Sequence, residues 1–130
     1  MFQTSVSAAM MEKSLSGLWQ RQQLIAHNIA NEDTPGFKAK RLAFEDALRR
    51  EINSASRVTA ISRQKMIERV EGISPTVYED KATATRADGN NVDKLNEQIE
   101  QARVQIQYNA LQRKINAHYS TLKYAISGGR

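Results

Sequence analysis

Apolar residues recur at alternating spacings of three and four along the first 30 residues of the chain. The positions with this spacing hold Ala8, Met11, Leu15, Leu18, Gln22, Ile25 and Ile29. Only Gln22 is polar, and the pattern is typical of the a and d positions of a coiled coil. It predicts one helix over residues 5–31, in which Gly17 is the one weak helix former.

Residues 27–41, which read HNIANEDTPGFKAKR, predict an abrupt end to this helix. Asn31 tolerates the left-handed conformation common at helix C-termini. Pro35 and Gly36 suit the two central positions of a type II turn, because proline presets φ near −65° and glycine adopts positive φ. We expect Asn28 and Asn31 either to satisfy backbone groups at this helix end, as simple capping residues, or to bond across an interface.

A second helical pattern closes the chain. It begins with Val92, Leu95, Ile99, Ala102 and Ile106. The apolar positions then change phase and continue as Tyr108, Leu111, Ile115, His118 and Leu122. The pattern predicts a helix of about 36 residues that runs to Ile126 and is N-capped by Asn91, with Asp93 in its first turn. A hairpin of two helices would leave much of this shifting stripe uncovered, which indicates a partner.

The middle of the chain is less regular. Phe44, Leu48 and Ile52 share one stripe, so residues 38–52 predict a short amphipathic helix or a loop with helical character. Residues 53–91 predict an extended arm with at most one hairpin. Its short strands would flank Gly72 and Pro75 and contain Val70, Ile73, Val77 and Tyr78.

The predicted fold class is mainly α. Two long terminal helices form an α-helical coiled-coil hairpin, and a short, irregular and partly extended segment lies between them. We divide the single domain into the N-terminal helix and turn (1–36), a basic middle arm (37–90) and the C-terminal helix (91–130). The core should be thin and aliphatic, because the 130 residues are 40% hydrophobic but only 6% aromatic. Trp19, beside Leu18, either broadens the apolar face or anchors a neighbouring chain.

The net charge of +5 comes mostly from residues 37–87, which hold eleven Lys or Arg against seven Asp or Glu. Such an excess suits nucleic acid, a membrane surface or an acidic protein partner. These basic residues form no single helical stripe and are not interleaved with stacking aromatics, which disfavours nucleic acid. A basic helical nucleic-acid-binding protein and a coiled-coil adaptor or chaperone remain the alternative functions.

The sequence shows no set of residues suited to catalysis. It has no cysteine, and His27 and His118 fall on different predicted helices. The adjacent pairs Glu32-Asp33, Glu45-Asp46 and Glu79-Asp80 suit surface charge, because neighbouring residues on a helix do not face one another. We therefore expect no enzyme, metal site or cofactor. The N-terminus lacks the pattern of a secretory signal, and no apolar run is long enough to span a membrane.

The residues around the predicted turn resemble a known signature. HNIANEDTPGFK is similar to the pattern S-N-I-A-N-x-x-T-P-G-[YF]-[KR] of the flagellar rod, hook and hook-associated axial proteins. His27 stands where serine is usual. The matching residues, which the resemblance marks as an assembly motif, are Asn28, Ile29, Ala30, Asn31, Thr34, Pro35, Gly36, Phe37 and Lys38.

Within this family the chain resembles the short proximal rod proteins. It leaves no room for the large inserted domains of distal rod and hook proteins. DGNNVD at residues 88–93 and YNALQRKINAHYSTLKYAISGG at residues 108–129 also resemble proximal rod sequences. Among the proximal rod proteins, FlgC is a close alternative to consider. Its C-terminal helix usually carries a different pattern with arginine and asparagine, which this sequence does not show.

The resemblance implies a structural subunit of the bacterial flagellar basal body, placed in the proximal rod that crosses the periplasm as part of the drive shaft for motility. Its implied partners are further copies of itself, FliE, FlgC, other rod subunits and the MS-ring region, with no nucleic acid and no direct membrane span. It also implies export by the flagellar type III apparatus without a cleaved signal peptide. The terminal helices would pack subunits together through Met11, Leu15, Leu18, Trp19, Ile25, Leu95, Ile99, Ile106, Leu111, Ile115, Leu122 and Ile126.

Overall fold

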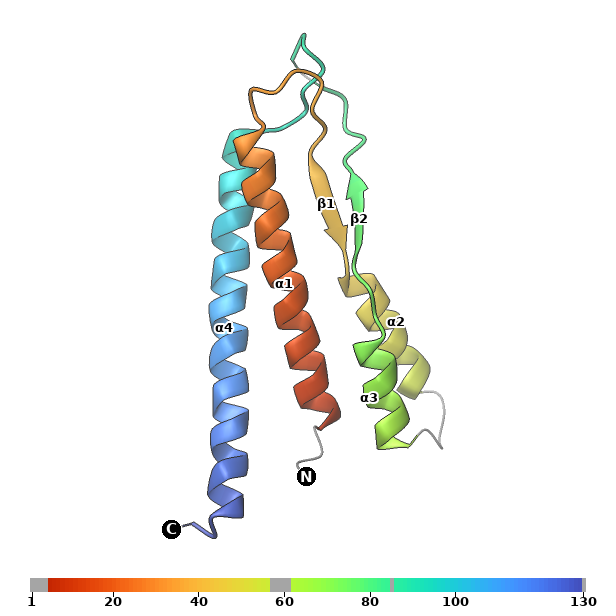
Figure 1. The fold of residues 1–130 in the computed structure, drawn as a ribbon, viewed down its shortest axis with the longest axis vertical. Helices are drawn as coiled ribbons and strands as arrows, with labels where there is room; N and C mark the ends of the chain where they lie inside the picture. The colour runs from red at the N-terminus through yellow and green to blue at the C-terminus, as the bar shows by residue number, and fades with distance from the viewer. Residues whose placement is uncertain (1–4, 57–61, 85, 130) are drawn as a thin grey trace.

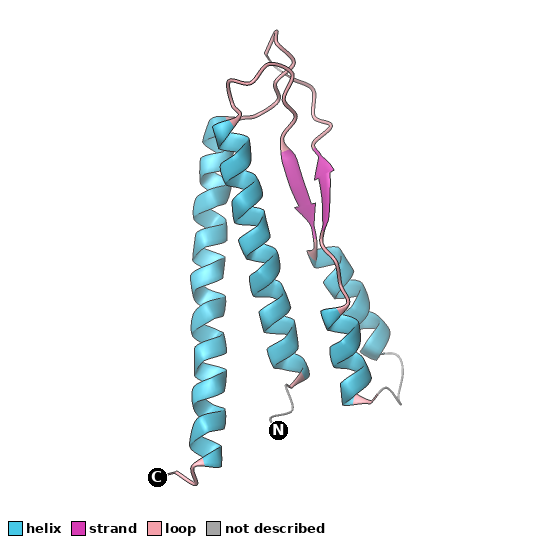
Figure 2. Ribbon diagram, viewed as in Figure 1, coloured by secondary structure: helices cyan, strands magenta, loops and turns pink. Residues whose placement is uncertain are grey.

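The computed structural model describes residues 5–56, 62–84 and 86–129. Its elements are, in chain order, α1 (Val6–Ala30), β1 (Lys40–Ala43), α2 (Glu45–Ser56), α3 (Arg63–Glu71), β2 (Thr76–Glu79) and α4 (Lys94–Ile126). Two long terminal helices lie side by side, and the middle segment, with one short strand pair, lies on one side of them (Figure 2). The predicted mainly α class is therefore confirmed.

Helix α1 lies between α4 on one side and the two strands, α2 and α3 on the other (Figure 1). Helices α1 and α4 run antiparallel. At one end, Ser5 Oγ lies 3.3 Å from His118 Nε2, and nearer the other end Gln22 Nε2 donates to Gln105 Oε1 at 2.8 Å. The Glu12 carboxylate also accepts a hydrogen bond from the Tyr119 hydroxyl. This bond is the largest of the causes that raise the pKa of Tyr119.

The bounds of α1 agree with the predicted helix to within one residue. Ser5 caps its start by accepting a hydrogen bond from Ala8 N at 3.1 Å. The predicted left-handed conformation of Asn31 is wrong, since this residue has φ −105° and ψ 17°. Its backbone and side-chain N–H groups both donate to the His27 carbonyl, so the last turn is satisfied without a left-handed residue.

The turn that follows α1 is as predicted. Gly36 has φ +72°, and Phe37 N donates to the Thr34 carbonyl at 3.2 Å. Positive φ at this position and a hydrogen bond from the fourth residue to the first are features of a type II turn. The turn therefore reverses the chain and directs it into β1.

The middle segment differs from the prediction in its strand pairing. Strand β1 occupies residues 40–43, so the helix predicted within 38–52 begins only at Glu45. The hairpin predicted around Gly72 and Pro75 is wrong, because β2 pairs antiparallel with β1, with Arg41 opposite Tyr78. Val70 lies in α3 rather than in a strand. The pairing joins strands separated by two helices, and a local sequence window carries no signal for it.

Helix α3 was not predicted, and it makes the middle segment a packed layer instead of an extended arm. Ile67 and Val70 of α3 form a buried cluster with Ala9 of α1. The partly buried hydrophobic residues around this cluster are Val6, Met10, Leu48 and Met66. The part of the predicted arm at residues 57–61 lies outside the described residues.

Helix α4 begins later than predicted. Asp93, not Asn91, is its N-cap and accepts a hydrogen bond from Asn96 N at 3.1 Å. An aspartate here also favours the positive end of the helix dipole. Asn91 instead bonds to two other loops. The helix has 33 residues and ends at Ile126, followed by Gly128 with φ +68°.

Only the second of the two apolar phases of α4 faces α1. The inward positions are buried or half-buried and hold Glu97, Gln101, Val104, Tyr108, Leu111, Ile115 and His118. Of the first phase, Val92 is buried just before the helix, whereas Leu95, Ile99 and Ile106 are 67%, 50% and 68% exposed. These three residues, which were predicted to take part in subunit packing, form an uncovered stripe of the kind expected.

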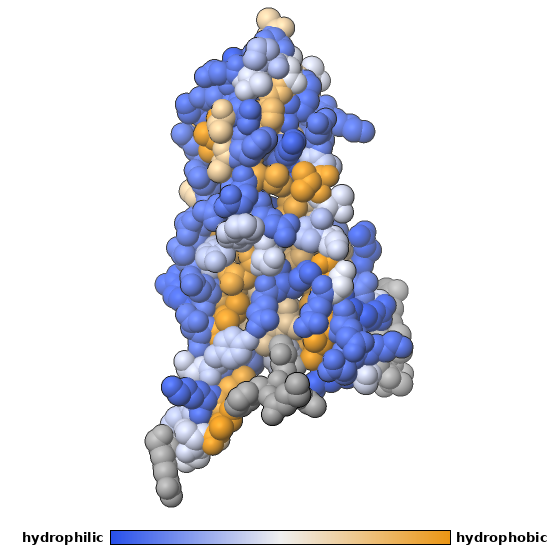
Figure 3. Space-filling model, in the orientation of Figure 1, coloured by the Kyte–Doolittle hydropathy of each residue, from blue (hydrophilic) through white to orange (hydrophobic). Residues whose placement is uncertain are grey.

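The face of the molecule drawn in Figure 3 is mostly hydrophilic, with apolar side chains in narrow bands between polar ones. The lowest of these bands lies close to the C-terminal end. Leu122, Tyr124 and Ile126 are large and exposed there, because α1 begins opposite His118 and does not reach them.

Candidate functional site

Asn28 of the signature joins three elements. Its side chain is completely buried, and its Oδ1 accepts a hydrogen bond from Lys40 N at 2.8 Å. Its Nδ2 donates to the Lys40 carbonyl at 2.9 Å and to Glu97 Oε2 at 3.1 Å. The amide thus pairs with the β1 backbone as a neighbouring strand would, and it links α1 to both β1 and α4.

Glu97 is a buried carboxylate on the inward face of α4. Its Oε1 forms an ion pair with Arg41 Nη1 at 2.5 Å, and no hydrogen bond with good directional geometry reaches this oxygen among the described residues. Arg41 Nε also lies 3.3 Å from Asp80 Oδ2. Burial lowers the pKa of Arg41, but the Glu97 and Asp80 carboxylates raise it by more. A buried charge is tolerated only when it is paired in this way.

Asn90 holds the turn from inside. Its buried Nδ2 lies 2.9 Å from each of three carbonyl oxygens, those of Asn31, Glu32 and Thr34. Its Oδ1 accepts a hydrogen bond from Val92 N at 2.8 Å. The two amide hydrogens are therefore shared among three acceptors, and one side chain sets the shape of the segment between α1 and Pro35.

The loop before α4 and the signature turn form one unit. Asn91 Oδ1 accepts from Ala39 N at 2.7 Å, and its Nδ2 donates to the Asp80 carbonyl at 2.8 Å. Gly36 N donates to the Asp88 carbonyl at 2.9 Å. Gly89 has φ +81°, and a Cβ added there would be in ordinary van der Waals contact with Gly36 Cα, at 3.7 Å, so the two loops pack against each other at these glycines.

Surface ion pairs brace the same unit. Lys94 Nζ lies 2.6 Å from Glu32 Oε1, and the hydrogen bond to Glu32 is the main cause that raises the pKa of Lys94. Arg86 Nη1 donates to the Glu32 carbonyl at 2.6 Å. Exposed pairs of this kind contribute little to stability because water screens them, so the buried asparagines dominate the geometry.

The signature residues divide into an internal and an exposed group. Asn28 is buried, and Ile29, Asn31, Phe37 and Lys38 are half-buried. Ala30 and the turn formed by Thr34, Pro35 and Gly36 are exposed. The Phe37 ring packs against His27 with centroids 5.5 Å apart. Sequence reasoning singled out Asn28 and Asn31 but missed Arg41, Asn90, Asn91 and Glu97 as parts of this site.

The residues predicted for subunit packing also divide. Met11, Ile25 and Ile115 are buried within the chain, and Leu15, Leu18 and Leu111 are half-buried. Trp19, Leu95, Ile99, Ile106, Leu122 and Ile126 are exposed. Only this last group is fully open to another molecule.

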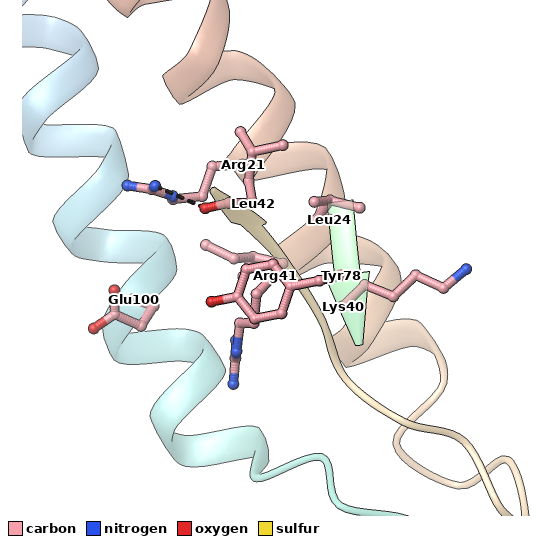
Figure 4. Close-up of a pocket in the computed structure, with 8 residues that line it drawn as sticks. Arg21, Leu24, Lys40, Arg41, Leu42, Tyr78 and Glu100 are labelled. Carbon is pink, nitrogen blue, oxygen red and sulfur yellow. Dashed lines mark hydrogen bonds between the residues drawn. The ribbon is translucent and has the colours of Figure 1, made fainter. Parts of the chain in front are cut away.

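A cavity of about 370 Å³ lies beside the Arg41 cluster (Figure 4). Arg21 of α1 and Arg41 of β1 reach toward α4, which contributes Glu100, and Tyr78 of β2 lies beside Arg41. Arg21 is already paired with Glu45, donating from Nη2 to Oε2 at 2.6 Å. Both arginines that line the cavity therefore form ion pairs within the chain, so their charges hold its elements together.

Within the described residues, no group of three or more His, Cys, Asp or Glu side chains is placed to hold a metal ion. The described helices include none that is both long and apolar enough to cross a membrane.

Comparisons with known proteins assign the family. No family model matches the chain. The chain is 36% identical over 125 residues to the flagellar basal body rod protein FlgB of Bacillus subtilis (strain 168), covering 92% of each protein. It is 31% identical over 117 residues to the protein of the same name from Aeromonas hydrophila, with 88% of each covered.

A third relative, from Borrelia hermsii, carries the same name and is 36% identical over 100 residues, which is 71% of this chain and 73% of the relative. Nothing in these comparisons favours a nucleic-acid-binding protein. The chain belongs to the FlgB family of flagellar basal body rod proteins and is a structural subunit of the flagellar rod.

Proposed function

We propose that the chain builds the rod by packing two exposed parts of α4 against neighbouring subunits. One is the outward face with Leu95, Ile99 and Ile106, and the other is the C-terminal end with Leu122 and Ile126. The observation that carries this proposal is the exposure of Leu95, Ile99 and Ile106 on one face of α4. A contiguous apolar stripe open to water is unfavourable in a monomer and marks a protein contact.

The signature then acts as an assembly motif through its exposed turn. Thr34, Pro35 and Gly36 project from a loop whose backbone Asn90 holds at three carbonyls. A loop held in one conformation before binding loses little conformational entropy when it docks. The buried Asn28 supports this motif from inside by joining α1 to β1 and α4.

The proposed partners are further copies of the chain and other axial subunits, including FliE and FlgC, close to the MS-ring region. We further propose a periplasmic rod location, export through the type III apparatus without a cleaved signal peptide, and no catalytic activity. The wholly structural use of the buried polar residues supports this role, because each of these side chains bonds to the chain itself.

Isolation of basal bodies from the bacterium that encodes the chain tests the proposal. A tagged chain should co-purify with the rod, whereas I99D and I106D should be expressed but absent from it. Q98D places the same charge on an exposed neighbouring position of α4 and should still be incorporated. Equal incorporation of all three variants would rule out the outward face as an assembly surface.

A further inference from the structure

The outward face of α4 carries a longer pattern than its three large apolar residues. Exposed residues follow one another there at alternating spacings of four and three, and we call them the α4 seam: Leu95, Ile99, Ala102, Ile106, Asn109 and Arg113. This spacing is typical of a helix that packs along another helix. No described helix or strand lies on the side of α4 away from α1 (Figure 1), so this seam has no partner within the described part of the chain.

Helix α1 exposes a seam of the same length and spacing. Its six positions are all exposed, and we call them the α1 seam: Glu12, Ser16, Trp19, Gln23, Ala26 and Ala30. Trp19 is the largest of these side chains and is 53% exposed. The seam is distinct from the positions of Gln22 and Asn28, which bond to α4 within the chain.

The two seams match in residue type when the helices run antiparallel. With Trp19 against Ile106, the other positions pair as Glu12 with Arg113, Ser16 with Asn109, Gln23 with Ala102, Ala26 with Ile99 and Ala30 with Leu95. Opposite charges meet at one end, and apolar residues meet apolar residues at the other. A parallel alignment of the seams would instead place Glu12 against Leu95 and Arg113 against Ala30, which takes both charges out of water without a partner.

The two charges at the end of the seams are free to pair with each other. Among the described residues, neither Glu12 nor Arg113 belongs to an ion pair. Glu12 Oε1 accepts a hydrogen bond from the neutral hydroxyl of Tyr119, and Arg113 Nε lies 3.4 Å from the Asn109 carbonyl of its own helix. Charge pairs between two molecules fix the direction and the register of their contact.

We propose that the α4 seam of one copy packs antiparallel against the α1 seam of the next copy; this contact rests on the proposed function. Its register places residue 28 of one copy level with residue 97 of the other, as Asn28 and Glu97 already are within the chain. Neighbouring copies would therefore stand side by side, parallel and at nearly the same height. The seams are different surfaces of one subunit, so the contact is heterologous and can repeat from copy to copy.

Disulfide trapping tests this contact, because the chain has no cysteine of its own. The double variant A26C/I99C is expressed in the native bacterium, and basal bodies are isolated and oxidised. Antiparallel seams should produce a ladder of dimers, trimers and larger products on a non-reducing gel. In the matched control S16C/I99C, the α1 cysteine lies ten residue steps away, about 15 Å along the helix, and the ladder should be roughly five-fold weaker.

The control and the single variant I99C also report the other modes of packing. A stronger ladder from S16C/I99C would show that the seams run parallel, and abundant dimers from I99C alone would show that α4 seams pack against each other. Cross-linking of I99C to a different protein would show that another axial subunit covers the α4 seam. Each of these three results would overturn the proposal.

Charge reversal tests the contact without cysteines. E12R and R113E should each lower the amount of the chain in basal bodies roughly five-fold, and E12R/R113E should restore it, because the reversed charges again attract each other. A double variant that is incorporated no better than the single ones would contradict the pairing of Glu12 with Arg113.

The same preparations separate the contact from the proposed function. If the wild-type chain and A26C/I99C enter basal bodies but the ladder does not exceed that of the control, the seam contact alone is wrong. If A26C/I99C itself is not incorporated, the charge-reversal variants decide. If the wild-type chain is absent from basal bodies, the proposed function fails and the contact fails with it.

Discussion

The side-chain amide of Asn28 in α1 donates a hydrogen bond to the carboxylate of Glu97 in α4 at 3.1 Å, with both side chains completely buried. The same amide pairs with both backbone groups of Lys40. An apolar residue at position 28 would leave three polar groups without partners in the interior. The interface of the two terminal helices is therefore specified by a polar contact as well as by apolar packing.

We expect N28A to lower the free energy of unfolding by roughly 3 kcal/mol, because it strands buried polar groups on β1 and α4. Urea denaturation followed by circular dichroism measures this change. N31A is the matched control. It removes a half-buried amide at the same helix end and should cost less than about 1 kcal/mol. Equal losses in the two variants would contradict the special role of Asn28.

We expect R41M to destabilise the chain by about 3–5 kcal/mol, because it leaves Glu97 charged and unpaired in the interior. In an E97Q background the same substitution should cost far less. A double-mutant cycle from denaturant unfolding gives the coupling energy between the two residues. K40M changes the neighbouring β1 position, whose side chain has no ion pair among the described residues, and should alter stability by no more than about 0.5 kcal/mol. A coupling energy near zero would show that the ion pair is not formed.

We expect G17A to destabilise the chain, although glycine to alanine in a helix normally stabilises by about 1 kcal/mol. An added Cβ would lie 2.7 Å from Phe44 Cδ1, so the ring of Phe44, the residue between β1 and α2, would have to move. Such overpacking costs about 1–3 kcal/mol. Thermal unfolding should show a lower Tm for G17A than for the wild-type chain. S16A, which changes an exposed neighbouring residue, should show no decrease in Tm. Relief of the loss by F44L would identify the clash as its cause.

We expect the Arg21–Glu45 pair to make stability depend on pH in the acidic range. The hydrogen bond from Arg21 is the largest cause that lowers the pKa of Glu45 below its ordinary value of 4.5, and burial opposes it. Because the folded-state pKa is the lower one, the stabilisation is complete above about pH 4.5 and is lost as pH falls through the folded-state value.

Unfolding experiments between pH 2 and pH 7 test this dependence. The wild-type chain should be more stable than E45Q by less than about 1 kcal/mol at neutral pH, since the Glu45 side chain is half-exposed. This difference should vanish at the acidic end. In an R21M background, E45Q should have no such effect. A difference that grows as the pH falls would have the wrong sign for this ion pair.

The sequence by itself determined the features that depend on local signals. The regular spacing of apolar residues predicted α1, and Pro35 and Gly36 predicted its turn, because both signals lie within a few residues. The resemblance of residues 27–38 also pointed to the correct family. The extent of α4 followed in the same way, apart from its start, because the predicted N-cap, Asn91, lies two residues before the true N-cap, Asp93.

Only the tertiary structure decided which face of α4 meets α1 and which strands pair. Both phases of α4 contain large apolar residues, so periodicity does not separate them. The buried Asn28 separates them, because its amide requires an acceptor that Glu97 supplies and Leu95 or Ile99 does not. The pairing of β1 with β2 was equally hidden. Val77 and Tyr78 were correctly predicted to lie in a strand, but no local pattern identifies β1, which precedes it by two helices, as the partner. Contacts between distant segments thus placed the buried polar residues, and those residues in turn left Leu95, Ile99 and Ile106 of α4 exposed.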